Sequence, residues 1–336
     1  MKLLILYREL AAYTVECINK LAHHAEITLI HYPLNAEAPF QFNLDERIKR
    51  IEKGSFEFER QRHSTEIYSH VLISGWADSD YSTMALNQKN AVRILAFDTA
   101  WKNTLKFQLG SIYLGWKLGG NYHYAFVPGK AQWTFAKRLR FKENQIQLGL
   151  YTATDHFQKV NAEHSLTKEL WCVARYIPQK NLSLLWEVFE ELTPNERSGW
   201  TLHCAGIGEM FDQRLESEGI FHHGFLQPDE LARKSSNASA FILPSIYEPW
   251  GVVVHEWAKS GKPMLLSSEV GAAKDLLIEG ENGFSFSPFS KEELKAALLH
   301  LFTTSDQNLK TMGEKSFDLS LKFSSDLWVQ HLLSLK

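Results

Sequence analysis

Residues 243–263, LPSIYEPWGVVVHEWAKSGKP, place two glutamates, Glu248 and Glu256, on either side of an expected helix start. Pro249 and Gly251 make a helix before residue 251 unfavourable, because proline is tolerated only in the first helical turn and glycine favours helix ends. We therefore predict a strand, a short loop and then a helix in this stretch. Glu248 should precede the helix, and Glu256 should lie about a turn and a half inside it.

The same strand-then-helix rhythm runs through the whole chain. Short apolar runs that suit buried strands alternate with helical patterns, which is typical of strand–helix–strand units in a parallel sheet. The rhythm pauses in a polar patch at residues 160–168 and then restarts. The runs are KLLILY, EITLIHY, HVLISG, VRILAF, YHYAFV and IQLGLY before the patch, and ELWCVARY, WTLHCAG, GIFHHGF, SAFILPS, PMLLSS and FSFSP after it.

This pattern predicts an α/β chain made of two doubly wound, Rossmann-like domains that face each other across a cleft. The length of 336 residues also exceeds what one hydrophobic core usually supports. We expect an N-terminal domain over residues 1–160 and a C-terminal domain over residues 161–322. An amphipathic helix over residues 323–336 is expected to pack back on the N-terminal domain.

The composition indicates a globular protein, with 44% hydrophobic residues, 22% charged residues and a net charge of -3. The first half is mildly basic, which suits a phosphorylated acceptor or a membrane surface but is too weak to predict nucleic-acid binding. Cys17, Cys172 and Cys204 form no CxxC pair, which fits buried thiols in a reducing cytoplasm. No apolar run has the length of a membrane span or a signal peptide. We therefore expect a cytoplasmic protein that at most touches the inner face of the membrane.

Several polar and glycine residues follow the predicted strands of the second domain. Ligands of doubly wound sheets bind outside the carboxyl ends of the strands, so these residues are candidates for a site. Arg175 and Lys180 could neutralise a diphosphate, although a solvated loop pair would look the same. Gly206, Gly208 and Gly224 would let the backbone approach a ligand closely, although each could simply form a turn.

The helix predicted to begin near Gly251 offers an anion site, because its first backbone amides, at Gly251, Val252 and Val253, lack helical partners. Glu248 could accept hydrogen bonds from sugar hydroxyls. Glu256 could accept from both hydroxyls of a ribose, since an ionised carboxylate bridges neighbouring donors. The alternative is a pair of surface acids that contributes only solubility.

Taken in order, these motifs resemble a known family. The series R-x4-K, G-x-G, a strand ending in G, then P-S-x-x-E-P-W-G-V-V-V-H-E, S-G-K-P and V-G resembles the retaining glycosyltransferases of the GT-B fold, specifically family 4, or group 1. The resemblance covers residues 168–290. In the N-terminal half, QLGLYTATDHF resembles the strand and D-x-F junction that precedes the linker in this family.

The resemblance implies a metal-independent hexosyltransferase that moves a sugar from a nucleotide-sugar, preferably a UDP- or GDP-sugar. The acceptor would be a glycan, a lipid-linked molecule or a small molecule, in cell-surface polysaccharide or glycolipid synthesis. The leaving phosphate would help to deprotonate the acceptor, so no protein base and no cofactor is implied, unlike in glycosidases. The implied roles are diphosphate binding for Arg175 and Lys180, sugar binding for Glu248 with Trp250 and Gly251, ribose binding for Glu256, and pocket lining for Gly206, Gly208, Gly224, Ser245, Val252 and Val253.

The N-terminal half departs from the family pattern in two places. The first strand is followed by YRELAAY instead of a glycine-rich turn. Asp98 stands where relatives often have a histidine, and we carry it as a catalytic candidate. Its neighbours Thr99, Trp101 and Lys102 are candidate acceptor contacts. The Asp78-Ser79-Asp80 triplet resembles the metal motif of the other glycosyltransferase fold, but we expect it in a solvated loop or at a helix cap.

Residues 130–142, KAQWTFAKRLRFK, interleave basic and aromatic side chains. Such a helix could lie on an anionic membrane, or it could present a solvated basic face with a buried apolar stripe. Two rival functions also remain open. One is a sugar-nucleotide epimerase of the same fold, and the other is a non-catalytic partner subunit.

Overall fold

The computed structural model describes residues 1–34, 39–159 and 167–336. The predicted domain boundary at residues 160 and 161 lies outside these described residues. The chain divides into two compact units. The N-terminal unit comprises Met1–Thr152 together with Phe323–Lys336, and the C-terminal unit comprises Ala153–Lys322.

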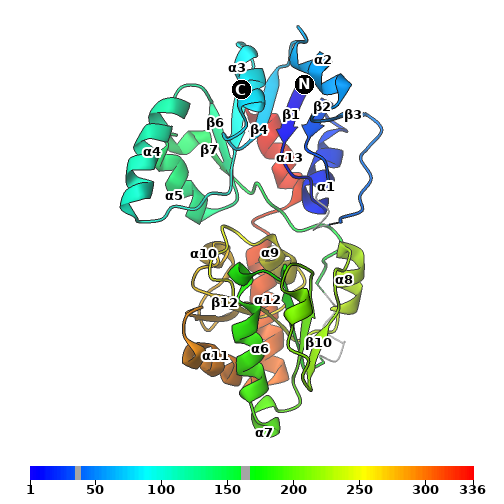
Figure 1. Cartoon of the computed structure of the whole chain (residues 1–336), viewed down its shortest axis with the longest axis vertical. Coiled ribbons are helices and arrows are strands. Elements are labelled where there is room, and N and C mark those ends of the chain that lie inside the picture. Colours follow the sequence, from blue (N-terminus) through cyan, green and yellow to red (C-terminus); the bar gives the residue numbers. More distant parts are fainter. Residues whose placement is uncertain (35–38, 160–166) are drawn as a thin grey trace. The chain divides into compact units, whose positions relative to one another are not determined.

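The N-terminal unit is built on a seven-stranded parallel sheet of order β3-β2-β1-β4-β5-β6-β7 (Figure 1). Its strands are β1 (Lys2–Tyr7), β2 (Glu26–His31), β3 (Ile48–Glu52), β4 (His70–Ser74), β5 (Val92–Ala96), β6 (Tyr124–Val127) and β7 (Ile146–Leu148). Its helices are α1 (Ala12–Leu21), α2 (Phe56–Arg62), α3 (Ser79–Asn87), α4 (Leu105–Leu118), α5 (Lys130–Arg138) and α13 (Ser325–Ser334), with a 3-10 turn η1 (Glu143–Gln145).

The C-terminal unit is built on a six-stranded parallel sheet of order β10-β9-β8-β11-β12-β13. Its strands are β8 (Glu169–Val173), β9 (Thr201–Ala205), β10 (Ile220–His222), β11 (Ala240–Leu243), β12 (Met264–Ser267) and β13 (Gly283–Phe286). Its helices are α6 (Leu182–Glu191), α7 (Pro194–Arg197), α8 (Pro228–Lys234), α9 (Val252–Lys259), α10 (Ala273–Leu276), α11 (Lys291–Thr303) and α12 (Asp306–Ser320), with 3-10 turns η2 (Pro178–Lys180) and η3 (Phe211–Gln213). Both units therefore have the predicted doubly wound, Rossmann-like form.

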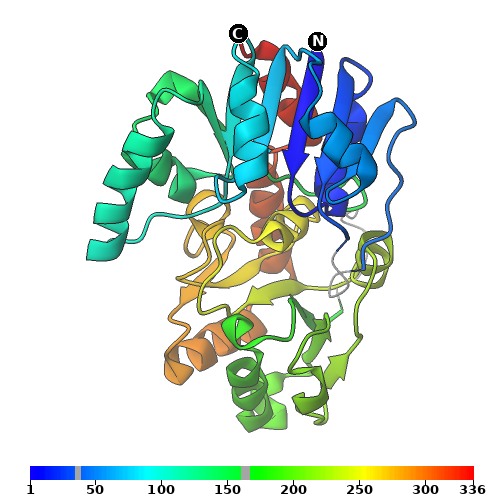
Figure 2. The same cartoon turned by 45° about the horizontal axis from the view of Figure 1, so that its top comes forward.

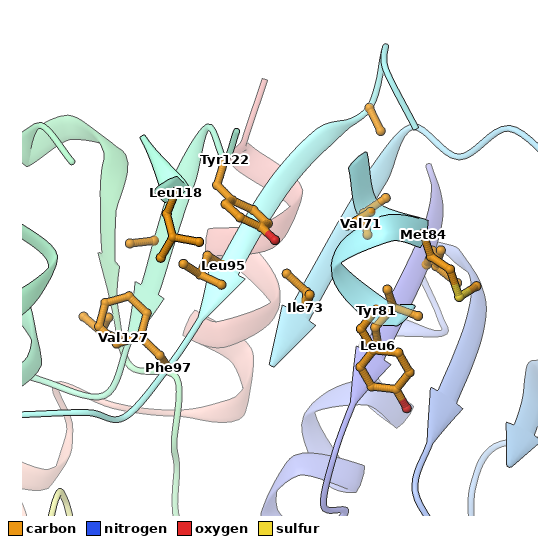
Figure 3. Packing of buried hydrophobic residues seen from close by; sticks show 14 of the residues in the cluster. Leu6, Val71, Ile73, Tyr81, Met84, Leu95, Phe97, Leu118, Tyr122 and Val127 are labelled. Atoms are coloured by element: carbon orange, nitrogen blue, oxygen red, sulfur yellow. The ribbon is translucent and has the colours of Figure 1, made fainter. Parts of the chain in front are cut away.

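Successive residues of the first sheet point to opposite faces, and both faces are covered. Leu6, Ile73, Leu95 and Val127 lie in one buried cluster, in which Tyr81 of α3 lies over Leu6 (Figure 3). The continuous apolar runs of the sequence follow from this, because a strand buried on both faces needs apolar residues at every position.

The opposite face of the first sheet is covered by α1 together with α13. Trp328 and Leu332 of α13 are buried in one cluster with Ile5 of β1 and Ile18 of α1. The ammonium group of Lys20 pairs with the Asp326 carboxylate at 3.2 Å. Figure 2 shows α13 (red) behind the strands of this unit. Residues from the far end of the sequence thus complete the core of the N-terminal unit.

The core of the C-terminal unit contains two of the three cysteines. Cys172 and Cys204 lie under α6, where the Trp186 ring is also buried, and Cys17 is buried in the N-terminal unit. All three are buried thiols that take part in no disulfide, and the Cys17 sulfur lies 3.5 Å from the Thr152 hydroxyl. The prediction of small core residues is confirmed for each of them.

The basic and aromatic segment at residues 130–142 forms α5 and the turn after it. Phe135 and Phe141 are buried in the core of the N-terminal unit, while basic residues such as Lys137 and Arg138 are exposed. The segment therefore presents a basic face over a buried apolar stripe, with Trp133 partly exposed. Membrane contact through this segment stays a prediction. Among the described residues, no helix is long and apolar enough to cross a bilayer.

Candidate functional site

The candidate site lies at the carboxyl ends of β8 and β11. The strand order of the C-terminal unit reverses direction between these two neighbours, and such a switch point is where doubly wound sheets bind ligands. The loop after β8 carries Arg175 and leads into η2, which ends at Lys180. The loop after β11 carries Ser245 and Glu248 and leads into α9. The fold thus brings two motifs, separated by about 70 residues, to one edge of the sheet.

Lys180 and Glu248 form an ion pair at this edge. The Lys180 ammonium group donates to Oε2 of Glu248, and the two side chains are only 12% and 13% exposed. The side chain of Gln179 also donates to the backbone carbonyl of Tyr247 at 2.6 Å, which ties η2 to the Glu248 loop. Arg175 is exposed on the loop before η2. A cation and a carboxylate therefore lie side by side at the switch point of the sheet.

The Glu248 loop is held by backbone hydrogen bonds to the loop after β12. The Glu248 amide donates to the Glu269 carbonyl at 3.1 Å, and the Gly271 amide donates to the Glu248 carbonyl at 2.9 Å. A Cβ atom at Gly271 would lie 1.9 Å from the Pro249 carbonyl oxygen, so only glycine fits there. Sequence reasoning did not assign Gly271 to the site, although the V-G pair of the motif series marked its position.

Two of the predicted site glycines allow neighbouring loops to pack closely, because a side chain at either position would clash. A Cβ atom at Gly206 would lie 2.0 Å from the Ala174 carbonyl oxygen, and one at Gly208 would lie 2.6 Å from the Tyr176 carbonyl oxygen. The Gly206 amide donates to the Gly224 carbonyl at 2.7 Å, which links the ends of β9 and β10. These glycines therefore position the Arg175 loop. Their predicted contact with a nucleotide stays a prediction.

Helix α9 begins as predicted, with Gly251 as its N-cap in a left-handed conformation (φ 92°). Because glycine has no side chain, Gly251 does not provide a side-chain cap for the first backbone amides of the helix. Val252 and Val253 are partly exposed in the first turn, while Val254 is buried. The N-terminus of α9 and Glu248 thus lie within a few residues of each other.

Glu256 lies on α9 in a half-buried position. Burial raises the pKa of its carboxyl group to about 7, and the charge of Lys259 opposes this shift. Lys259 itself pairs with Asp155 at 2.9 Å, which fixes the D-x-F junction against α9. Glu256 therefore differs from an ordinary surface acid. This agrees with the prediction that Glu248 precedes the helix and Glu256 lies inside it.

Ser245 and Trp250 are buried. Their exposed fractions are 0% and 1%, and the Ser245 carbonyl accepts a hydrogen bond from the Ser267 hydroxyl at 2.5 Å. Stacking of the Trp250 ring on a sugar is therefore excluded in this conformation. Both residues can influence the shape of a pocket only by supporting the residues that line it. The sequence could not reveal this, because the direction of a loop side chain is decided by tertiary packing.

In the N-terminal unit, Asp98 follows β5 and lies next to a tyrosine. The Tyr151 hydroxyl donates to Oδ2 of Asp98 at 3.2 Å, and the Gln132 side chain donates to the Asp98 carbonyl at 3.0 Å. Burial, together with the nearby Asp98 charge, raises the pKa of Tyr151 well above its usual value. Asp98 is thus a half-buried carboxylate with an oriented donor beside it.

The candidate acceptor residues beside Asp98 differ in their surroundings. Trp101 is half-buried, with its ring stacked 6.2 Å from that of Phe135 and with the Arg138 guanidinium 4.7 Å from its centre. Much of this ring is therefore used in packing on α5. Thr99 and Lys102 are partly exposed beside it.

The Asp78-Ser79-Asp80 triplet caps a helix. The Asp78 carboxylate accepts from the Tyr81 amide at 3.0 Å and so forms the N-cap of α3. It also accepts from the Tyr32 hydroxyl at 2.6 Å and from Lys53. The pairing of Asp78 with Lys53 was not predicted from the sequence. Across the described ranges, no group of three or more His, Cys, Asp or Glu side chains is arranged to hold a metal ion.

Comparison with known proteins finds glycosyltransferases similar to this chain in sequence and in fold. Residues 154–317 match the family model described as Glycosyl transferases group 1. An uncharacterised glycosyltransferase of Methanocaldococcus jannaschii is 25% identical over 159 residues, which is 45% of this chain and 43% of that protein. The chain spans less than half the length of the curated relatives it matches.

Solved structures match nearly the whole chain. Sucrose-phosphate synthase from Thermosynechococcus elongatus superposes with a TM-score of 0.72 at 15% identity, covering 98% of this chain and 96% of that one. HepE of Anabaena, solved with UDP and glucose, superposes with a TM-score of 0.68 at 12% identity, covering 99% and 98%. The chain therefore has the GT-B glycosyltransferase fold, and its residues 154–317 carry the sequence pattern of the glycosyl transferases group 1.

Proposed function

We propose that the chain is a retaining glycosyltransferase of family 4 that moves a sugar from a nucleotide-sugar to an acceptor hydroxyl. The observation that carries the proposal is the Lys180–Glu248 pair at the switch point of β8 and β11, beside the N-terminus of α9. The group 1 sequence match covers this whole edge of the sheet. The UDP and glucose bound in HepE support a nucleotide-sugar as the donor class.

In this proposal the donor lies along the Glu248 to Glu256 segment. Lys180 and Arg175 hold the diphosphate, and the amides at the start of α9 add partial positive charge. Glu248 accepts hydrogen bonds from sugar hydroxyls, since Lys180 occupies one of its two carboxylate oxygens and a carboxylate accepts several bonds. Glu256 accepts from the ribose hydroxyls.

Reaction breaks the bond between the anomeric carbon and the leaving phosphate oxygen, which keeps the electron pair. The growing negative charge falls beside Arg175 and Lys180, and one such preorganised donor group is commonly worth about 10²–10³ in rate. The acceptor hydroxyl passes its proton to the leaving phosphate and bonds to the same face of the sugar. No cofactor or metal ion takes part in this scheme.

The N-terminal unit supplies the acceptor contacts in this proposal. Asp98, oriented by Tyr151, would accept a hydrogen bond from a sugar hydroxyl, with Thr99 and Lys102 beside it. The acceptor is a glycan, a lipid-linked molecule or a small molecule, and the reaction takes place in the cytoplasm during cell-surface polysaccharide or glycolipid synthesis.

The test is donor turnover in purified protein. A thermal-shift screen of UDP-, GDP-, ADP- and dTDP-sugars first identifies the donor, because a bound ligand raises the melting temperature by mass action. Nucleotide release is then compared among the wild type, Arg175→Ala and Glu248→Gln. We expect each substitution to reduce turnover by about 10²–10³-fold.

Arg233→Ala is the matched control, since Arg233 is an exposed arginine in the last turn of α8. It should keep full turnover. Equal turnover in the wild type and both site variants would disprove the residue assignment. Formation of an epimeric nucleotide-sugar without nucleotide release would show an epimerase, and no turnover with any donor would favour a non-catalytic subunit.

A further inference from the structure

Helix α4 carries a stripe of large apolar side chains that face away from the protein. The exposed fractions are 71% for Leu105, 60% for Leu109, 62% for Ile112, 60% for Tyr113 and 75% for Trp116. Large apolar residues that are this exposed are common singly, but a contiguous set on one element marks an interaction surface. We call these five residues the α4 stripe.

The stripe follows the helical repeat. Its members recur at spacings of three and four residues, which places them on one side of the helix. The side that packs on the protein includes Ser111, Gly115 and Leu118, with Phe107 and Leu114 partly buried beside them. Gly115 lies against the backbone of Arg138 and Leu139. Figures 1 and 2 both show α4 outside α5 at the edge of its unit. The apolar stripe and the packed side thus lie on opposite faces of α4.

Most charged residues near the stripe in the sequence are basic, and the first acid after it is Glu143, which pairs with Lys137 at 3.3 Å. Residues 99–142 include eight Lys and Arg residues and no Asp or Glu. Lys106 and Lys117 lie on α4 itself and are exposed, and they flank one side of the stripe. Arg138, Arg140 and Lys142 are exposed on the neighbouring segment. The partner of this face must therefore be apolar inside and negatively charged at its surface.

We propose that α4 lies flat on an anionic lipid bilayer, with the α4 stripe in the acyl boundary and the flanking lysines among the headgroups. A basic rim around an apolar stripe matches the chemistry of such a membrane surface. A second copy of the chain is a poorer match, because a symmetric contact would set lysines against lysines. The helix has 14 residues and is about 21 Å long, which suits a helix in the interface plane and is too short to span a bilayer.

This surface replaces the one expected from residues 130–142. There the phenylalanines are buried and Trp133 is only partly exposed, whereas α4 offers five well-exposed apolar side chains together with charge. The inference goes beyond the proposed function, because it concerns where the protein resides. Its test reads membrane binding, which does not depend on donor turnover.

The test is flotation of the purified full chain with lipid vesicles at low salt. One set of vesicles is phosphatidylcholine alone, and the other contains about one-third phosphatidylglycerol, because anionic lipid attracts basic side chains. We expect the wild type to float with the anionic vesicles only. Leu109→Gln combined with Trp116→Gln should weaken the partition at least about tenfold, since two large apolar side chains no longer enter the bilayer. Lys106→Glu combined with Lys117→Glu should weaken it to a similar degree, and added salt should weaken the wild type.

Phe56→Gln combined with Ile67→Gln is the matched control for lost apolar surface. These two residues are 87% and 77% exposed in the same unit but lie outside α4. The control should bind like the wild type, and circular dichroism should be unchanged in all variants because every substituted side chain is exposed.

Three results would overturn the proposal. The first is a wild type that does not bind anionic vesicles. The second is undiminished binding by the Leu109 and Trp116 variant while Arg140→Glu combined with Lys142→Glu abolishes binding. The third is a dimer in sedimentation that only the α4 substitutions dissociate, which would assign the stripe to a second copy of the chain.

Discussion

Both units place a lysine beside a carboxylate at the carboxyl ends of their strands, but the two pairs are completed differently. In the N-terminal unit, Asp78 accepts from Lys53, from the Tyr32 hydroxyl and from the Tyr81 amide, and it is only 3% exposed. In the C-terminal unit, Lys180 is the one side-chain partner of Glu248 within the described part of the chain. The first pair is saturated by the protein, whereas the second keeps capacity for a ligand.

The difference separates a structural ion pair from a candidate binding pair. Burial alone would raise the pKa of Asp78, but the hydrogen bonds from Lys53, Tyr32 and the Tyr81 amide hold it below its usual value. The stability that this pair contributes is therefore present above the ordinary pKa of an aspartate and is lost as the pH falls through the lowered value. A fully bonded carboxylate of this kind fixes α3 and has little left to offer a substrate.

The largest expected effect comes from removing each lysine in turn. Lys53→Met leaves a buried carboxylate without its cation and should lower the free energy of unfolding by about 3–5 kcal/mol. Lys180→Met should cost less stability, about 1–2 kcal/mol, because Glu248 can reach water. Urea unfolding of both variants gives these values.

Turnover should show the reverse order. Lys180→Met should lose about 10²–10³ in donor turnover, while folded Lys53→Met should retain the activity of the wild type. Equal losses of turnover in the two variants would mean that the pairs do not differ in kind and would remove the basis of this comparison.

The second prediction concerns the backbone that carries Glu248. Gly271→Ala would force a Cβ atom against the Pro249 carbonyl oxygen, and we expect a loss of about 2–4 kcal/mol in the free energy of unfolding. Gly110→Ala on α4 is the control, because a Cβ there meets nothing within 4 Å and alanine favours a helix by about 0.4–1 kcal/mol. Thermal unfolding should move in opposite directions for the two variants. A Gly271→Ala protein as stable as the wild type would show that this contact is not needed.

The smallest expected effect is a pH dependence of opposite sign to that of Asp78. The pKa of Glu256 is raised to about 7 by burial, so its charged form disfavours the fold. Stability relative to Glu256→Gln should therefore fall as the pH rises from the ordinary glutamate value towards 7, by about 2 kcal/mol in total. Denaturant unfolding of ligand-free protein at about pH 5 and about pH 8 measures this change.

Glu209→Gln, at an exposed position after β9, is the control for the pH experiment and should show no such trend. If the difference between wild type and Glu256→Gln is the same at both pH values, the carboxyl group does not titrate in this range. That result would also remove the predicted difference in pH dependence between Asp78 in the N-terminal unit and Glu256 in the C-terminal unit.

The sequence predicted the features that depend on neighbouring residues. The strand and helix rhythm gave both Rossmann-like units, and Pro249 with Gly251 gave the start of α9, because proline and glycine act on their own stretch of backbone. It did not reveal which side chains the packing turns inward. The resemblance assigned Trp250 to sugar binding, yet the side chain is only 1% exposed. The bonds between Gly271 and the Glu248 loop join segments about 20 residues apart, and no local pattern encodes them.

Helix α4 is a second case in which the sequence did not reveal which side chains are buried. Its sequence, LKFQLGSIYLGWKL, is apolar over most of its length and would suit a buried helix. Ser111, Gly115 and Leu118 are its buried residues, Phe107 and Leu114 are partly buried against the core, and five other large apolar side chains are left exposed. Periodicity can divide a helix into faces, but it cannot say which face meets the protein when both are apolar.

The position of α13 in the chain has a consequence for biosynthesis. Trp328 and Leu332 complete a core whose other members, such as Leu3 and Ile5, leave the ribosome much earlier. The C-terminal unit is continuous from Ala153 to Lys322 and has all its parts before α13 is made. Because domains fold as units during synthesis, the unit that is translated second is expected to fold first. Until α13 is made, the N-terminal unit would expose the apolar face that α13 covers. Nascent chains that stop before residue 328 are therefore expected to bind chaperones.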